Sequence, residues 1–443
     1  MLTREQAKKL VEKAFGFSTF PECEIRLASS EQTSIRFALN GITTSGYTID
    51  QTMSITSSKD GQSGTTSVTE FDDASLREAL KRSEQLARIS PPNPERTSPL
   101  PPQKYSSEEN FAGSTAQARN AAMIPHVRAI IEGAKANGLV AAGFFERSAN
   151  AAAVANKAGN FGFGRTTDSH LSTTVRAPDG SSSGWASQPA VHIEEIDGAA
   201  VGKVATGKCL RWKGAKRLEP GKYTVVLEPT AVNDLVQILG FAGFQARAAE
   251  EGRGLLSRKG GGTLLGDKLY PDWVTLRSEP FHKLYSSLPW AGGSGLPAAP
   301  ITWIEKGVVK NLFYDRYYAE KAGKAPTAAP TNLVLEGGGQ SLDELIGSVE
   351  RGLLVTRFWY IRVVNPQTVQ LTGLTRDGLF LIENGKVTSP VVNFRLNESP
   401  ARLLQNAIAA GQPVRVRGGE GQGMIAPPLV VKDFPFTSVS DAV

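Results

Sequence analysis

The chain contains 443 residues, of which 40% are hydrophobic and 21% are charged, a balance typical of a globular protein. Its net charge of +6 is small for this length, which disfavours a dedicated nucleic-acid-binding protein. No uninterrupted apolar stretch approaches the ~18 residues that a membrane span needs. The amphipathic N-terminal sequence lacks the apolar segment of an export signal, so we expect a cytoplasmic protein without a membrane partner.

The first 90 residues predict a small α+β domain. Thr3 and Gln6 form a capping box that opens a helix. Three β-type segments follow at residues 23–27, 33–39 and 53–57, with hairpin turns at the Asn-Gly and Asp-Gly pairs of positions 40–41 and 60–61. Asp72 and Asp73 then begin a second helix.

A proline-rich connector follows at residues 91–113, because proline neither continues a helix nor donates to a sheet. In the next segment, residues 114–220, the spacing of apolar residues predicts a helix over 114–137. Strands are expected at 139–145 and 151–156. A further helix is expected at about 193–208.

Residues 221–443 predict a large β-rich domain with helices packed outside. Residues 223–227 (YTVVL) form a short, continuous apolar run, typical of a buried strand, and Pro229 then opens a helix. Hairpin turns are expected at positions 306–307 and 384–385, and short helices at about 314–322 and after Ser341. The predicted fold class is therefore α+β.

The usual signatures of hydrolytic and nucleotide-binding sites are missing. Cys23 and Cys209 form no CxxC motif, and no two histidines have the spacing of a zinc site. The sequence GSSSG at 180–184 matches a nucleophile elbow around Ser182, but no helix follows, so we predict a flexible turn. The glycine-rich residues 260–266 precede Asp267 and lack the lysine of a P-loop. The histidines are His126, His170, His192 and His282.

Several short motifs together resemble the TldD/PmbA (TldD/TldE) family, whose members were also described as modulators of DNA gyrase. The order and spacing of these motifs carry the resemblance, which covers nearly the whole chain. They are YTVVLEP at 223–229, RGLLVTR at 351–357, LTGLTRD at 371–377, LIENGKV at 381–387 and GGEGQ at 418–422. The resemblance implies a zinc peptidase that trims unstructured peptides.

Catalytic members of this family carry HExxxH on the helix after the YTVVL-like strand, and a late cysteine completes the zinc set. In this chain the two histidines are replaced by Val236 and Phe241, the glutamate by Gln237, and the cysteine by Arg417. Aliphatic and aromatic side chains offer no lone pair to zinc, and an amide is not a general base near neutral pH. We therefore expect neither a catalytic residue nor a metal in this chain.

These replacements resemble the TldE/PmbA branch, which lacks the zinc motif. The resemblance implies a heterodimer that encloses a chamber. In it a TldD-like subunit holds the zinc, and this chain contributes to the chamber wall and to the path of an unfolded peptide. A homodimer is a further option for the isolated chain. The resemblance places the peptide channel at Thr356, Arg357, Thr375, Arg376, Gly418, Gly419 and Gln422.

Two alternatives stay open at this point. One is an independent peptidase with a serine, threonine or cysteine nucleophile in place of zinc. The other is an oligomeric or nucleic-acid-associated binding protein that uses the basic residues of segment 208–222, although these also suit a solvated helix end and loop.

Overall fold

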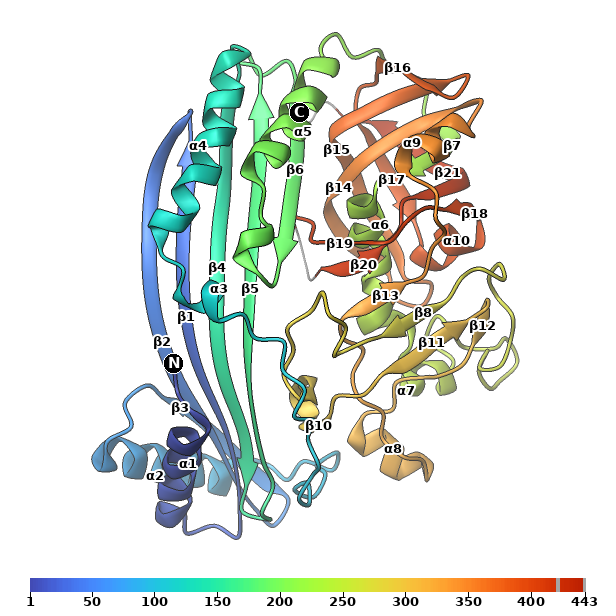
Figure 1. Cartoon of the computed structure of the whole chain (residues 1–443). Coiled ribbons are helices and arrows are strands. Elements are labelled where there is room, and N and C mark those ends of the chain that lie inside the picture. Colours follow the sequence, from blue (N-terminus) through green and yellow to red (C-terminus); the bar gives the residue numbers. More distant parts are fainter. Residues whose placement is uncertain (420–422, 441–443) are drawn as a thin grey trace.

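The computed structural model describes residues 1–419 and 423–440. The N-terminal part is built on one long antiparallel sheet, and the C-terminal part contains two further large sheets with short helices (Figure 1). The predicted α+β fold, with an N-terminal antiparallel sheet and a large β-rich part, is therefore confirmed. No helix in the described ranges combines the length and hydropathy needed to cross a bilayer.

The N-terminal sheet joins residues from both sides of the connector. Its strand order is β3-β2-β1-β4-β5-β6, so that β1, before the connector, pairs with β4, after it. The predicted boundary between residues 1–90 and 114–220 is therefore not a boundary between sheets. The strands are β1 Glu22–Ala38, β2 Gly41–Lys59, β3 Gln62–Val68, β4 Val140–Asn156, β5 Phe161–Arg176 and β6 Ser183–Ala190.

Two strands are longer than predicted. The segments expected at 23–27 and 33–39 are both parts of β1, and those expected at 139–145 and 151–156 are both parts of β4. The polar residues between them continue the alternation of the strand, since Ser29 of β1 and Arg147 of β4 are buried in phase with the apolar residues on either side. The predicted turns at Asn40 and Asp60 are confirmed, since both residues have positive φ and join the first three strands.

Four helices cover the other face of this sheet (Figure 1). Alternate residues such as Ile25, Ile35, Phe145 and Leu171 point toward these helices and form its apolar cores. The capping box at Thr3 and the cap at Asp72 are both present. The helices are α1 Arg4–Phe17, α2 Asp73–Ile89, α4 Asn120–Ala136 and α5 Gly198–Arg211.

The helix predicted over 114–137 is divided in two, α3 Gly113–Gln117 and α4. Between them the carbonyl of Ala118 accepts a 2.8 Å hydrogen bond from Nε of Arg147, a fully buried residue of β4. A buried guanidinium must find acceptors, and this one takes a carbonyl that a continuous helix would use. The helix predicted at 193–208 likewise begins later, because Asp197 caps α5 after a 3-10 turn, η1 Ile193–Glu195.

The proline-rich connector contacts both parts of the molecule. The hydroxyl of Tyr105 donates to the carbonyl of Gly295 at 2.7 Å and accepts from the amide of Asn160 at 2.9 Å. The amide of Asn110 donates to the carbonyl of Tyr285 at 2.8 Å. The connector therefore lies as a strap between the N-terminal sheet and the C-terminal part.

The first C-terminal sheet closes on itself, because β14 pairs with both β7 and β15 in the order β14-β7-β21-β17-β15. The predicted buried strand is β7, and the predicted turn at Asn384 joins β15 to β16. The strands are β7 Gly221–Leu227, β14 Arg351–Asn365, β15 Gln370–Glu383, β16 Lys386–Pro390, β17 Phe394–Glu398, β18 Ala407–Ala410 and β21 Leu429–Val439.

A second C-terminal sheet has the order β12-β11-β8-β13-β20-β19 and includes the predicted turn at Lys306. Its strands are β8 Leu276–Ser278, β11 Ile301–Glu305, β12 Val308–Val309, β13 Leu333–Leu335, β19 Val414–Val416 and β20 Met424–Ala426. A separate pair consists of β9 Trp290–Ala291 and β10 Leu296–Pro297, with the 3-10 turn η3 Gly292–Ser294 between them.

The helices of the β-rich domain were predicted to pack outside its sheets. Helix α6 Pro229–Val236 instead lies buried in the apolar core that both C-terminal sheets share. The capping box at Ser341 is confirmed, and Asp315 caps the helix predicted at 314–322. The remaining helices are α7 Ala246–Glu250, α8 Arg316–Ala322, α9 Leu342–Gly347 and α10 Pro400–Gln405.

The close packing of α5 on β6 depends on a glycine. A Cβ atom at Gly184 would lie 2.2 Å from the carbonyl oxygen of Ala205 and 2.5 Å from the amide nitrogen of Cys209. We expect G184A to lower the free energy of unfolding by about 1–3 kcal/mol, measured by urea denaturation, because α5 must move away from the sheet.

The matched control is G207A in α5, where a Cβ would meet nothing within 4 Å. This change should leave stability equal or slightly higher, because alanine is the better helix former. Equal losses in both variants would contradict the packing argument.

Candidate functional site

The helix α6 and the turn that follows it carry the positions aligned with the zinc motif. Glu228 precedes the helix, Pro229 occupies its first turn, and Val232, Leu235 and Val236 are completely buried. The chain then widens into a π-turn, η2 Leu239–Gly243. These three side chains form a buried apolar stripe along the helix.

The structure brings only two of the four aligned positions together. Gln237 and Phe241 line one groove of about 360 Å³, and the ring of Phe241 is 64% exposed. Val236 belongs to the apolar core and does not line that groove. Arg417 follows β19, and its guanidinium lies 3.0 Å from the carboxylate of Glu146 on β4.

The residues at these positions do not fit a zinc ion. Val236 presents a buried alkyl group, Phe241 presents an aromatic ring, and the guanidinium of Arg417 is directed toward carboxylates of the N-terminal sheet. The described residues contain no group of three His, Cys, Asp or Glu side chains placed to hold a metal. We derive no metal-dependent step for this chain.

The groove beside the π-turn is mainly apolar. Aromatic and aliphatic side chains from the π-turn, β13, β14 and β20 form its walls, and Gln237 and Asn332 contribute amides. A concave, largely apolar site of this size suits a side chain of a peptide or a small ligand. Its apolar lining residues are Ile238, Phe241, Pro330, Leu333, Phe358, Ile361 and Met424.

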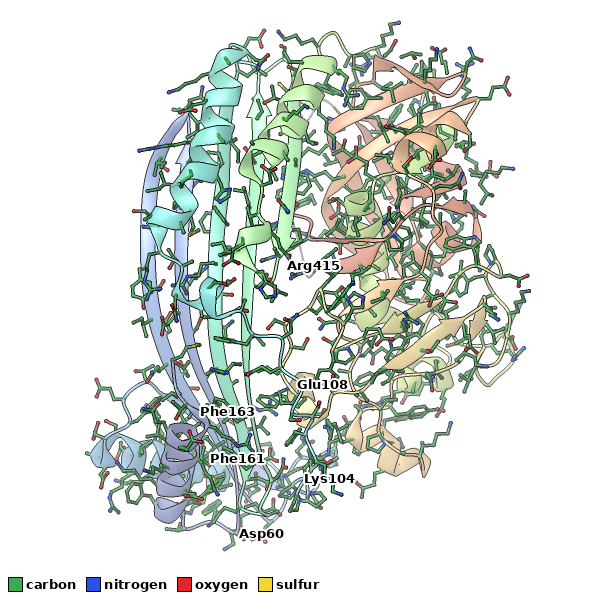
Figure 2. All side chains as sticks on the ribbon, viewed as in Figure 1. Asp60, Lys104, Glu108, Phe161, Phe163 and Arg415 are labelled. Atoms are coloured by element: carbon green, nitrogen blue, oxygen red, sulfur yellow. The ribbon has the colours of Figure 1, made fainter. Side chains whose placement is uncertain are left out.

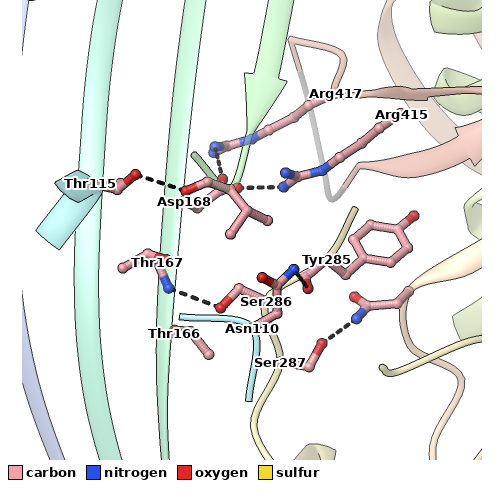
Figure 3. A network of polar contacts seen from close by, with 12 residues as sticks. Asn110, Thr115, Thr166, Thr167, Asp168, Tyr285, Ser286, Ser287, Arg415 and Arg417 are labelled. Carbon is pink, nitrogen blue, oxygen red and sulfur yellow. Dashed lines mark hydrogen bonds and ion pairs between the residues drawn. The ribbon is translucent and has the colours of Figure 1, made fainter. Parts of the chain in front are cut away.

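A polar junction joins β19 to the N-terminal sheet (Figure 3). Arg415 pairs with Asp168 of β5, and Arg417 lies 3.7 Å from the same carboxylate. Burial raises the pKa of Asp168, and the charge of Arg415 opposes this effect. Burial and the charges of both arginines lower the pKa of the neighbouring His170 to about 3, so this imidazole is neutral at physiological pH. Arg415 lies between the two parts of the molecule (Figure 2).

The predicted channel residues of β14 and β15 lie side by side. Arg357 pairs in register with Arg376, and Thr375 pairs with Phe358. The guanidinium of Arg376 lies 5.4 Å from the ring of Trp359, and burial lowers its pKa. These positions therefore share one region of the closed sheet.

Arg357 is the centre of this region. Its Nε donates to the carboxylate of Asp377 at 2.9 Å, and both side chains are buried. The guanidinium lies 4.6 Å from the ring of Trp185 and 5.2 Å from that of Trp359. A Cβ at Gly419 would lie 2.8 Å from Nη1 of Arg357, so this glycine lets the backbone approach the arginine.

The remaining predicted channel residues have different surroundings. Thr356 donates to Glu228, which also pairs with Lys208 at 2.6 Å. Thr375 is buried and donates to the amide oxygen of Asn393, which indicates an internal role. Gly418 lies against Asp234 of α6. Gln422 lies outside the described residues.

Asp377, Trp185 and Trp359 were not identified from the sequence. Asp377 ends the LTGLTRD motif and could have been found as the nearest acid to Arg376. Trp185 comes from β6, 172 positions before Arg357, and nothing in the sequence connects the two. Only the packing of β6 on the closed sheet brings them together.

Comparison with known proteins gives two sequence-profile matches. The profile of the PmbA/TldA metallopeptidase C-terminal domain matches residues 220–438, and that of PmbA/TldA metallopeptidase domain 1 matches residues 23–87. An uncharacterised protein of Methanocaldococcus jannaschii is 27% identical over 169 residues, 34% of this chain and 37% of that protein. A metalloprotease PmbA homolog of Buchnera aphidicola is 22% identical over 168 residues, 36% of each chain. The alignment thus spans only about a third of these curated relatives.

Solved structures share the whole fold. The TldE of Thermococcus kodakarensis has a TM-score of 0.84 at 20% identity, covering 97% of this chain and 99% of that one. A Thermotoga maritima protein described as a candidate modulator of a DNA gyrase has a TM-score of 0.84 at 19% identity, covering 97% and 100%. A similarly described protein of Bacteroides thetaiotaomicron has 0.84 at 23%, covering 99% and 100%. At these identities the matches establish the fold alone.

The buried pair of Arg357 and Asp377 gives a prediction about stability. D377N leaves the guanidinium buried without its carboxylate, so we expect the free energy of unfolding to fall by about 3–5 kcal/mol in urea denaturation. The control is E12Q, which removes an exposed carboxylate 3.7 Å from Lys8 and should not change stability measurably. A D377N variant as stable as E12Q would contradict this assignment.

Proposed function

The chain belongs to the PmbA/TldD metallopeptidase family, and from this premise we propose that it is the non-catalytic subunit of a TldD–TldE type zinc peptidase acting on unfolded peptides. In this proposal a TldD-like partner supplies the zinc and the general base. A cytoplasmic location is part of the same proposal. The likeness to a solved TldE agrees with this assignment at the level of the fold.

The observation that carries the proposal is the chemistry of the aligned positions. Val236 is buried in the core, Phe241 lies exposed at a groove, and Arg417 is paired with carboxylates of the N-terminal sheet. None of these groups is a zinc ligand. Gln237 cannot accept a proton from water at neutral pH, so general base catalysis would also have to come from another chain.

The same geometry suggests what this chain contributes. Arg376 is partly exposed and Gly419 is exposed near the junction of β6, β14 and β15, where the proposal places an extended peptide. Thr356 and Arg357 are buried in the same region and would support the wall of the channel. Main-chain pairing with a strand tolerates many sequences, which suits an unfolded substrate. Thr375 would act indirectly by fixing Asn393.

Reconstitution tests this function. The purified chain alone should contain less than stoichiometric zinc by atomic absorption and should not cleave an unstructured peptide. Adding a TldD-like subunit with an intact HExxxH motif should restore cleavage, and inactivating that motif should abolish it. One tightly held zinc per isolated chain, or full activity without the partner, would refute the proposal.

The alternative of an independent nucleophile has little structural support. Ser182 is fully buried, and its hydroxyl lies 3.3 Å from the sulfur of Cys209. Burial raises the pKa of the Cys23 thiol to about 11 and also raises that of Cys209. A nucleophilic cysteine requires the opposite shift, toward the thiolate.

Thiol labelling tests this point. At pH 8 both native thiols should stay protonated and inaccessible, so a maleimide should label neither of them while the urea-unfolded chain is labelled at both. Rapid labelling of one native cysteine, together with chelator-resistant peptidase activity, would favour the independent enzyme.

The basic segment also has structural roles. Lys208 pairs with Glu228, and the indole of Trp212 donates to the carbonyl of Val391 at 3.0 Å. The guanidinium of Arg211 lies 5.5 Å from the ring of Phe380. These contacts hold the end of α5 against the closed sheet, which favours the structural interpretation over a nucleic-acid site.

A further inference from the structure

The groove beside the π-turn opens onto the C-terminal core, where β13, β14 and β20 lie together with α6 (Figure 1). Its floor consists of core side chains that are at most 8% exposed, namely Ile238, Leu333, Phe358 and Met424. Phe241 stands at the rim and is 64% exposed. A groove of about 360 Å³ with an apolar floor and an apolar rim leaves hydrophobic surface in contact with water, as binding sites do.

A strained part of the backbone brings Ile361 into the same groove. Residues three apart on a regular strand point to opposite faces, yet Phe358 and Ile361 of β14 both line the groove. The register of β14 with β15 shifts between Trp359 and Arg362, and Tyr360 inside this bulge has a φ of 56°. A positive φ is unfavourable for a bulky residue, and both β-bulges and strained residues concentrate at functional sites. The bulge therefore shapes the groove at an energetic cost, which indicates a binding role.

The charges around the groove favour an uncharged occupant. Among the described residues that line it there is no lysine or arginine, and Asp234 is the single charged one. Its carboxylate accepts a 2.9 Å hydrogen bond from the backbone N–H of Phe358. The amide of Asn332 donates to the hydroxyl of Ser287, so this polar lining group already has a partner within the chain. An acidic side chain would find no cation in the groove, and a basic one would lose its water against an apolar floor.

The groove also borders the predicted peptide channel. A Cβ at Gly418 would lie 2.1 Å from Oδ1 of Asp234, so a predicted channel residue lies against a residue of the groove. Phe358 directly follows Arg357 on β14. Channel and groove therefore share the strand β14 and the segment around Gly418, and an extended peptide that passes Gly418 can place one side chain in the groove.

We propose that the groove binds one large apolar side chain of the peptide substrate, such as phenylalanine, leucine or methionine. The proposal rests on the proposed function, which makes the ligand an unfolded peptide. Burial of the side chain against the groove floor removes apolar surface from water on both partners. Folded proteins keep most such side chains inside, whereas unfolded chains expose them. A groove of this kind therefore selects unfolded substrates through one apolar contact and does not require a particular sequence around it.

The methyl resonances of methionine test the location of this contact. The chain has four methionines, and Met424 is the one that lines the groove. An unstructured glycine, serine and alanine peptide with one central phenylalanine should shift the Met424 methyl resonance through its ring current. The resonances of Met53 and Met123, which lie in the N-terminal cores, should not move. The variant M424L, which lacks the groove resonance, identifies it in the spectrum.

A matched pair of tryptophan variants tests the role of the groove in affinity. By fluorescence anisotropy, the wild type should bind the phenylalanine peptide about tenfold or more tightly than the same peptide with alanine at that position. I361W fills the groove and should abolish this preference. The control V364W adds the same ring to an exposed residue of β14 outside the groove and should keep the preference. Circular dichroism should show the same thermal unfolding for both variants, which confirms that each is folded.

Three outcomes would overturn the proposal. The first is a wild type that binds the phenylalanine and alanine peptides equally, or whose Met424 resonance stays in place at millimolar peptide. The second is a folded I361W variant that keeps the preference of the control. The third is a TldD-like subunit that shifts the Met424 resonance by itself and prevents the effect of the peptide, which would assign the groove to that subunit. The binding measurements use the full chain alone and require no cleavage, so this proposal and the proposed function fail separately.

Discussion

Arg415 of β19 and Arg417, which follows that strand, fix the C-terminal part against the N-terminal sheet, and the candidate site depends on this contact. Arg415 and Arg417 reach the carboxylates of Asp168 and Glu146, which project from the face of the sheet that has no helices. Because β6 belongs to that sheet, the same contact helps to place Trp185 beside Arg357. Arg417, the position at which the resemblance led us to expect the replaced zinc ligand, therefore belongs to the contact that joins the two parts.

Much of the fold follows from local sequence. The apolar run before Leu227, the proline after it and the capping residues at Thr3, Asp72 and Ser341 each determine an element through contacts within a few residues. The full length of β1 and β4 could not be predicted, because their middle segments are polar and include buried side chains such as Ser29 and Arg147. The break after α3 depends on Arg147, a distant residue of β4.

The candidate site was predictable only in part. The motifs at 351–357 and 371–377 identify two strands, and their pairing places Arg357 opposite Arg376. Not every side chain that contacts these arginines lies in the two motifs. Trp185, whose ring lies beside the guanidinium of Arg357, is on β6. No sequence spacing encodes such a contact, because it depends on how two separately formed sheets pack.

The π-turn after α6 is a rare backbone feature, and its surroundings give a physical reason for it. Such turns are often associated with functional sites. In this chain a Cβ at Gly240 would lie 3.0 Å from the side chain of Leu333 and 3.6 Å from that of Pro330, so the turn packs closely against the segment leading into β13. It also places Phe241 at the rim of the groove. Packing and the shape of the groove are therefore sufficient physical reasons to keep the turn, and its presence does not require a metal.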